Sequence, residues 1–191
     1  MKKVILGTAI AIITLLSNMF NASAMTPTYG GKLTWNIGDI HYYLSGGATD
    51  YADIIAASAD NWVNTGVGWN PLWPNDRTYV QSNATFDFYT ATSGGSGVVA
   101  ETQFFGNGSY CVYPSELTQA SWYWNEIWIY TSTFNTLSSS YKQGTITHEM
   151  GHAFGLAHTN DKYSIMCQIG AGRAVNTVQA ADNEAFNSKY N

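Results

Sequence analysis

Residues 148–158 read His148-Glu149-Met150-Gly151-His152-Ala153-Phe154-Gly155-Leu156-Ala157-His158 and hold three of the four histidines in a chain of 191 residues. Residues four apart share one face of a helix, so the imidazoles of His148 and His152 can bind the same metal ion. Gly155 can adopt the left-handed conformation that ends a helix, and the chain can then turn so that His158 supplies a third ligand. Three nitrogen ligands and an open fourth position are typical of catalytic zinc.

Glu149 directly follows the first of these ligands, which places its carboxylate beside the metal rather than on it. Zinc lowers the pKa of a bound water toward about 7 and polarises a substrate carbonyl. A glutamate in this position can act as general base, taking a proton as the water attacks and passing it to the leaving amine. The segment therefore predicts a zinc-dependent endopeptidase with one catalytic Zn²⁺ and no covalent intermediate.

The same segment resembles the HExxHxxGxxH motif of the metzincin metalloproteases. Ser164-Ile165-Met166 looks like their Met-turn, which implies that Met166 packs beneath the zinc ligands. Residues 158–166 are most similar to the matrixin branch, which has Ser or Thr after the third histidine and Asp three positions after it, here Asp161. Asp182, followed by Phe186 and Tyr190, is similar to the closing helix of matrixins. Asp161 and Asp182 are candidates to brace the site by hydrogen bonds, and the alternative is that they are surface caps.

The resemblance also indicates where a substrate would align and where this chain departs from the family. Val98, Val99 and Ala100 are placed like the edge strand on which matrixins align their substrate. No histidine lies between residues 66 and 125, so the structural zinc site of the family cannot be carried over. Gln168 stands where astacins and serralysins have a tyrosine, and the Pro-x-Tyr wall of matrixins is not recognisable.

Hydrophobic periodicity predicts the remaining elements of an α+β fold with a twisted mixed β-sheet. A helix from Tyr51 to Val63 has one apolar face, with Thr49 or Asp50 as N-cap and Gly66 as its stop. Strands are expected at 33–44, 85–90, 97–105 and 126–131, and helices at 138–156 and 177–190. With the resemblance, these elements imply a metzincin-like catalytic domain with an active-site helix, a covering helix and a C-terminal helix.

Residues 1–24 are predicted to be a secretory signal peptide. Met1-Lys2-Lys3 is a short basic start, Val4–Leu16 is almost entirely apolar, and Ala22-Ser23-Ala24 is a small-residue cleavage pattern. The apolar run is shorter than the roughly 20 residues that span a membrane. Cleavage after Ala24 would leave one catalytic domain, residues 25–191. We therefore expect a secreted monomer of bacterial source, with no stable membrane insertion after cleavage.

The charge balance argues against a nucleic-acid partner. The chain has 8 basic and 13 acidic residues, a net charge of −5, and loss of Lys2 and Lys3 with the signal would make it −7. Proteins that bind the phosphate backbone carry a basic excess instead. The expected partner is a protein or peptide substrate. The acidic surplus leaves structural calcium open, although no ligand loop marks a site for it.

Cys111 and Cys167 are the two cysteines of the chain. Export to an oxidising compartment would permit one disulfide between them, and the alternative is a pair of buried thiols. A single bridge does not make a disulfide scaffold, so the hydrophobic core must supply most of the stability.

Trp122-Tyr123-Trp124 and Trp128 form an aromatic cluster. Packing beside the active-site helix is the favoured interpretation, and a platform for sugar or peptide is the alternative. Two further functions also stay open. One is a secreted zinc hydrolase acting on cell-wall peptide amides, and the other is a non-catalytic, zinc-containing module that binds glycans at a surface. The intact Glu149 and the open fourth ligand position favour the endopeptidase.

Overall fold

The computed structural model describes residues 25–65, 76–106, 111–112 and 120–191. The predicted signal peptide and the predicted helix stop at Gly66 lie outside the described residues. Within the described ranges the chain forms a six-stranded sheet with the order β2-β1-β3-β6-β4-β5. The strands are β1 (His41–Leu44), β2 (Asp76–Arg77), β3 (Phe86–Ala91), β4 (Ala100–Phe105), β5 (Cys111–Val112) and β6 (Trp124–Tyr130).

The sheet is mixed, as predicted. Strands β2, β1, β3 and β6 run parallel to one another. Strand β4 is antiparallel to β6, and β5 is antiparallel to β4. β5 pairs only with Phe104 and Phe105, so the pairing described for the outer edge of β4 stops before Gln103. The first predicted strand was too long, because Leu33 makes only an isolated bridge to Trp122 and regular pairing begins at His41.

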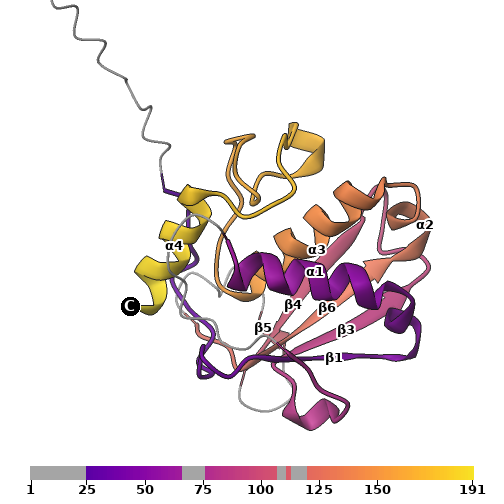
Figure 1. Cartoon of the computed structure of the whole chain (residues 1–191), viewed down its shortest axis with the longest axis horizontal. Helices are drawn as coiled ribbons and strands as arrows, with labels where there is room; N and C mark the ends of the chain where they lie inside the picture. Colours follow the sequence, from indigo (N-terminus) through magenta and orange to yellow (C-terminus); the bar gives the residue numbers. More distant parts are fainter. Residues whose placement is uncertain (1–24, 66–75, 107–110, 113–119) are drawn as a thin grey trace, which may run out of the picture.

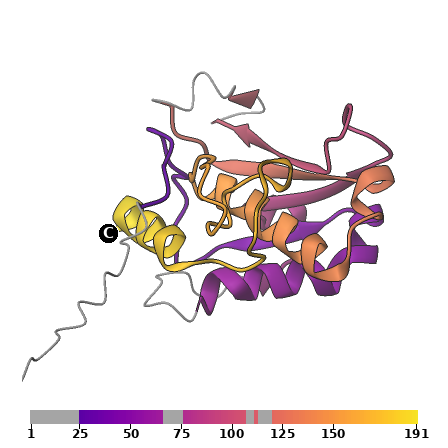
Figure 2. The same cartoon turned by 90° about the horizontal axis from the view of Figure 1, so that it is seen from above.

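Helices α1 (Ala52–Val63) and α3 (Ser139–Ala153) lie side by side across one face of the sheet (Figures 1 and 2). The short helix α2 (Thr131–Phe134) directly follows β6, and α4 (Ala180–Tyr190) ends the chain. None of the described helices combines the length and apolar character needed to cross a membrane. The order of strands and helices confirms the predicted α+β fold.

The two long helices differ in how they begin. Ser138 is the N-cap of α3, and its side chain accepts a hydrogen bond from the backbone N–H of Tyr141. The N-cap of α1 is Tyr51 rather than Thr49 or Asp50, so that prediction was wrong. The reason is a six-residue 3₁₀ helix, Gly46–Tyr51, that leads into α1 and incorporates both of the expected capping residues.

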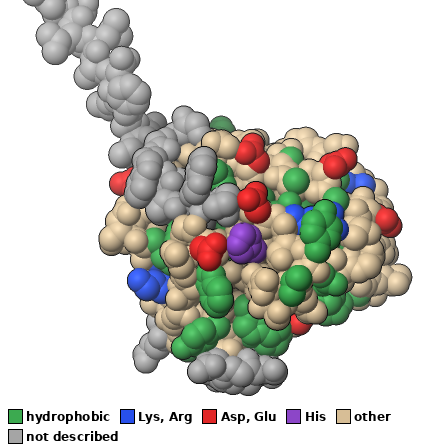
Figure 3. Space-filling model, turned by 60° about the horizontal axis from the view of Figure 1, so that its bottom comes forward, with side chains coloured by type: hydrophobic (Ala, Val, Ile, Leu, Met, Phe, Trp, Pro, Cys, Tyr) green, Lys and Arg blue, Asp and Glu red, His purple; other side chains and the backbone are tan. Residues whose placement is uncertain are grey.

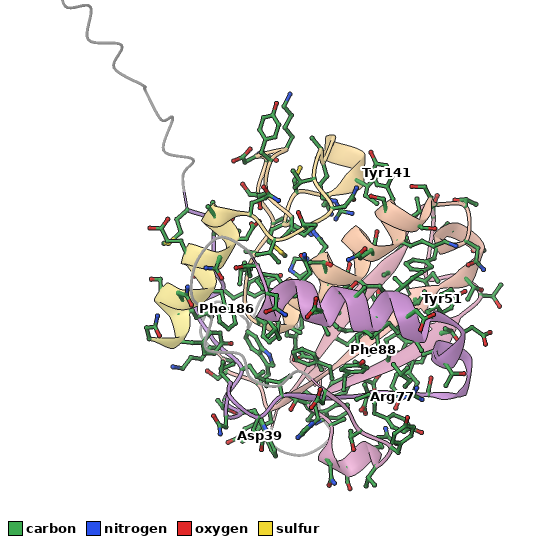
Figure 4. The ribbon with its side chains drawn as sticks, viewed as in Figure 1. Asp39, Tyr51, Arg77, Phe88, Tyr141 and Phe186 are labelled. Carbon is green, nitrogen blue, oxygen red and sulfur yellow. The ribbon has the colours of Figure 1, made fainter. Side chains whose placement is uncertain are left out.

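The core between the helices and the sheet is built largely from aromatic rings. Phe154 lies edge-on to Phe86 and to Trp62, with ring centroids 5.1 and 5.4 Å apart. Figure 4 shows Phe88 on the sheet beneath α1 and Phe186 on α4. The indole N–H of Trp62 donates to the carbonyl of Thr147 in α3, 2.9 Å away. These contacts hold α3, which carries the histidine motif, against α1 and the sheet.

The aromatic cluster is divided between the two faces of the sheet. Trp122 is fully buried, and its indole N–H donates to the carbonyl of Ala153 at 3.0 Å. Trp128 stacks on Tyr89 with ring centroids 4.9 Å apart, on the face turned away from the helices. On the side of the molecule shown in Figure 3, hydrophobic and acidic side chains are interspersed on the surface. Packing accounts for Trp122, in line with the favoured interpretation.

Asp87 of β3 lies, like Tyr89, on the face of the sheet turned away from the helices, and its carboxyl should make the stability of the fold depend on pH. Its side chain is 4% exposed, and burial raises the pKa of its carboxyl from 3.8 to about 6, against the opposing hydrogen bond from Gln81. A raised pKa means that the folded state holds the proton more tightly than the unfolded state. This contribution therefore favours folding below about pH 4 and is lost as the pH rises toward 6.

We expect the free energy of unfolding of Asp87→Asn to exceed that of the wild type at pH 7. The difference between the two proteins should be about 1–2 kcal/mol larger in favour of the variant at pH 7 than at pH 4. Urea unfolding of both proteins at the two pH values measures this change. Asp53→Asn, at an exposed position of α1, is the matched control and should show no comparable pH-dependent gain. An Asp87→Asn difference that is the same at both pH values would contradict the prediction.

Candidate metal centre

The structure brings the three motif histidines to one point. Their Nε2 atoms lie 3.1 Å apart for His148 and His152, 3.2 Å for His148 and His158, and 3.0 Å for His152 and His158. Tetrahedral zinc with Zn–N bonds of 2.0–2.1 Å needs nitrogens about 3.3 Å apart. The donor set therefore fits a zinc ion in number, chemistry and spacing.

The other ring nitrogens of two ligands bind backbone carbonyls. Nδ1 of His148 lies 2.7 Å from the carbonyl oxygen of Ile165, and Nδ1 of His152 lies 2.9 Å from that of Leu156. A carbonyl only accepts, so each Nδ1 must carry the hydrogen and each Nε2 presents its lone pair to the metal. Tyr29 places its hydroxyl 3.2 Å from the same Nδ1 of His152.

Burial keeps the three imidazoles neutral, which is the form that binds metal. Desolvation lowers the pKa of His148 well below its ordinary value of 6.5, and it lowers that of His152 to about 3. His158, the exposed member of the three, has a pKa that partial desolvation also lowers. The mutual proximity of the imidazoles disfavours protonation of His148 and His152 further.

Gly155 makes the turn that delivers the third ligand. Its φ of +95° is in the left-handed region, as the motif predicts, and helix α3 ends just before it at Ala153. A Cβ at this position would lie 2.5 Å from Cε of Lys189 in α4, a flexible side chain that would have to shift. The chain then leaves α3 with the backbone N–H of Ala157 bound to the carbonyl of Pro27, 2.7 Å away.

Glu149 is held beside the histidines by β4. Its side chain is 6% exposed, and the hydroxyl of Thr102 lies 2.8 Å from Oε2 of Glu149 and 2.9 Å from its backbone oxygen. Burial raises the pKa of the Glu149 carboxyl to about 7, and the hydrogen bond from Thr102 opposes that rise. The sequence reading missed Thr102, and likewise Tyr29, because neither lies in a motif.

Met166 lies beneath the centre. It is fully buried, and an added Cβ on Gly151 of α3 would come within 2.4 Å of its Sδ and 3.0 Å of Trp62. The turn that carries Met166 is bound to Asp182: the Ser164 hydroxyl donates to Oδ1 at 2.5 Å, and the backbone N–H of Ile165 donates to Oδ2 at 2.9 Å. Asp182 thus braces the turn from α4.

Gly151→Ala tests the packing between α3 and this turn. The new methyl group has no free volume, so we expect a loss of about 1–3 kcal/mol in the free energy of unfolding. Denaturant unfolding of the wild type and the variant measures the loss. Gly46→Ala is the control, because a Cβ there meets no atom within 4 Å. Equal losses in the two variants would show that the contact with Met166 is not responsible.

A cavity of about 470 Å³ opens over the centre. Val98, Val99 and Ala100, the three residues predicted for the substrate edge, line the same cavity as the histidines, although only Ala100 belongs to β4 and the first two directly precede it. The opposite wall comes from α3 and from the segment after Met166. That wall includes Thr145, Gln168, Ile169, Gly170 and Arg173.

Of the two alternatives for Cys111 and Cys167, the disulfide is not formed in the structure. Cys167 is a free, buried thiol, and its Sγ lies 3.6 Å from the carbonyl oxygen of Gln168. The free thiol of Cys167 matches the second alternative, and it lies in the buried segment that follows the Met-turn, where the backbone of Cys167 forms an isolated bridge with Thr159. The side chain of Cys111 lies outside the described residues.

The centre can be compared with known proteins. The comparison with curated proteins found no match. Among solved structures, archaemetzincin from Methanopyrus kandleri is similar at 13% identity with a TM-score of 0.48, and the match covers 82% of this chain and 98% of that one. The model of the matrixin family matches residues 75–191, which is more than half of the chain and includes every motif residue described above. The chain therefore belongs to the matrixin family of zinc metalloproteases.

Proposed function

We propose that this protein is a secreted endopeptidase that uses Glu149 as its general base. The observation that carries the proposal is the convergence of three neutral imidazoles, with Nε2 atoms 3.0–3.2 Å apart, next to one buried carboxyl group. A zinc ion held there supplies a Lewis acid that polarises the scissile carbonyl and makes water a better nucleophile.

Glu149 performs the proton transfers in this proposal. Its carboxylate accepts a proton from the attacking water and then gives it to the nitrogen of the departing amine. Thr102 positions this carboxylate, because its hydroxyl lies within hydrogen-bond distance of Oε2. A pKa near 7 suits a group that must both take and return a proton at neutral pH.

The edge of β4 orients the substrate in this proposal. Val98, Val99 and Ala100 line the cavity, and β5 pairs only with the far end of the strand. An extended peptide can add a strand to such an edge through main-chain hydrogen bonds, which are independent of sequence. Such binding would bring a main-chain carbonyl over the histidines and suits an enzyme that cuts within a peptide chain.

Digestion of a peptide library, casein and purified peptidoglycan by residues 25–191, with products identified by mass spectrometry, tests the proposal. We expect cleavage inside peptides and casein that stops with a zinc chelator and returns with added zinc. Cleavage restricted to peptidoglycan would replace the proposal with the cell-wall hydrolase. A zinc-loaded, folded protein that cuts none of these substrates would favour the non-catalytic module.

Secretion is a separate part of the proposal and rests on the basic, apolar and small-residue pattern of residues 1–24. Expression of the full chain in a bacterial host, followed by fractionation and N-terminal sequencing, tests it. We expect an exported product that begins at Met25. A product that stays in the cytoplasm with its N-terminus intact would contradict this part alone.

A further inference from the structure

Arg173 lies in the wall of the zinc cavity and is buried. Its side chain is 4% exposed, and it lines the same cavity as His148, Glu149 and His158. Backbone hydrogen bonds hold its loop in place: the N–H of Arg173 donates to Gln168 at 3.3 Å, and the next N–H donates to the carbonyl of Lys162 at 2.8 Å. The guanidinium therefore belongs to a built wall of the cavity.

The guanidinium is poorly satisfied by the protein. Its Nε and Nη2 atoms are buried and have no hydrogen-bond partner in the described part of the chain. The ion pair found among those residues joins His41 and Asp39, and Arg173 takes no part in it. Leaving charged donors buried without acceptors is costly, and a carboxylate is the acceptor that matches the guanidinium fork with two parallel hydrogen bonds.

The loop that follows Arg173 packs on the N-terminal half of α3. Asn176, three residues further on, donates to the hydroxyl of Ser140 at 2.9 Å, and it packs so closely on Gly144 that a Cβ there would lie 2.3 Å from its side-chain oxygen. Thr145 lines the cavity on the next turn of the helix. The loop that carries Arg173 lies along this end of α3, on the side of the labelled Tyr141 in Figure 4.

The same end of the cavity holds the beginning of β4. The carbonyl of Val98 accepts a hydrogen bond from Thr133 of α2, which comes just before α3 in the chain. The other end of β4 lies at the end of α3, where Phe104 packs edge-on to Trp122 and Trp122 binds the carbonyl of Ala153. The loop that carries Arg173 therefore lies at the same end of α3 as Val98–Ala100, and all of these residues line one cavity.

This position relates Arg173 to the substrate residues that follow the scissile bond. A peptide that pairs antiparallel with β4 has its C-terminal half beside Val98–Ala100, so the amine-side residues of the scissile bond reach the Arg173 end. We propose that Arg173 binds the side-chain carboxylate of an Asp or Glu immediately after the scissile bond, and so makes the enzyme selective for acidic residues there. This inference rests on the proposed function.

A matched pair of fluorogenic peptides that differ only by Glu or Gln after the scissile bond tests the selectivity. We expect the wild type to cleave the Glu peptide with about 10–100-fold higher kcat/KM, which corresponds to one or two charge-assisted hydrogen bonds. Arg173→Gln should remove that preference while still cutting the Gln peptide. Arg173→Lys, which keeps the charge but not the planar fork, should fall between them.

Lys162→Gln is the matched control, since it removes one exposed positive charge from the same part of the chain. We expect it to keep the preference for Glu. Equal rates on the two peptides in the wild type, or an unchanged preference in Arg173→Gln, would overturn the assignment. A preference for Glu on the other side of the scissile bond would overturn it too.

Binding separates this inference from the proposed reaction. Zinc-loaded Glu149→Gln should bind the Glu peptide more tightly than the Gln peptide by a similar factor, measured by fluorescence anisotropy without turnover. Adding Arg173→Gln should abolish the difference. If binding discriminates but no variant or wild type cleaves, the assignment of Arg173 stands and the proposed function fails. If the enzyme cleaves peptides but neither assay discriminates between the Glu and Gln peptides, the proposed function stands and the assignment of Arg173 fails.

Discussion

Glu149→Gln is expected to lower kcat/KM for peptide hydrolysis by about 10²–10⁴-fold, with zinc still bound at one ion per chain. The amide has the shape of the carboxylate, and its oxygen can still accept the hydrogen bond from Thr102, so the fold should persist. The glutamine amide, however, is too weak a base to take a proton from water near pH 7. The three imidazoles are unchanged, and each keeps its Nε2 directed to the metal.

The measurement is the initial rate on one peptide for both proteins, with zinc content determined by elemental analysis. Glu184→Gln is the control, because Glu184 is exposed on α4, away from the cavity, and should retain the wild-type rate. If Glu149→Gln turned over at the wild-type rate, a different group would have to move the proton. If it lost its zinc, the variant would say nothing specific about the base, so Glu149→Asp, with the same charge on a shorter stem, would be compared at full zinc occupancy.

The metal ligands could be predicted from the sequence because their geometry is local. His148 and His152 share a helix face, and Gly155 sets the turn to His158 within six residues of the second ligand. The structure places all three as the motif implies. The same holds for Met166, whose position depends on a turn only eight residues after the last histidine.

The supporting groups could not be predicted, because they come from distant parts of the chain. Thr102 lies 47 residues before Glu149, and the strand pairing that brings it there carries no sequence signature. Tyr29 and Arg173 reach the cavity from segments without regular secondary structure, where hydrophobic periodicity gives no information. The wrong N-cap prediction for α1 has a local cause. Thr49 and Asp50 are as compatible with the 3₁₀ helix that they form as with a capping position, so the residue types alone do not separate the two.

Asp182 connects α4 to the metal centre through the Met-turn, and its removal is expected to have the largest effect on stability. The carboxylate is fully buried and accepts hydrogen bonds from Thr26, Ser164 and the backbone N–H groups of Ile165 and Gln179. Asp182→Ala leaves all four donors without their acceptor. We expect a loss of about 3–5 kcal/mol in the free energy of unfolding, since each buried orphan donor costs about 1–3 kcal/mol and partial rearrangement recovers some of it.

The effect should extend to zinc. The carbonyl of Ile165 holds Nδ1 of His148 at 2.7 Å, and the N–H of the same residue is bound to Asp182. Releasing that N–H loosens the group that orients a ligand, and loss of such support typically costs 10–100-fold in metal affinity. Urea unfolding and competition with a zinc chelator measure the two effects. Glu184→Ala, from an exposed site on the same helix, should leave both unchanged. Wild-type zinc affinity in a destabilised Asp182→Ala protein would show that Asp182 supports the fold without orienting His148.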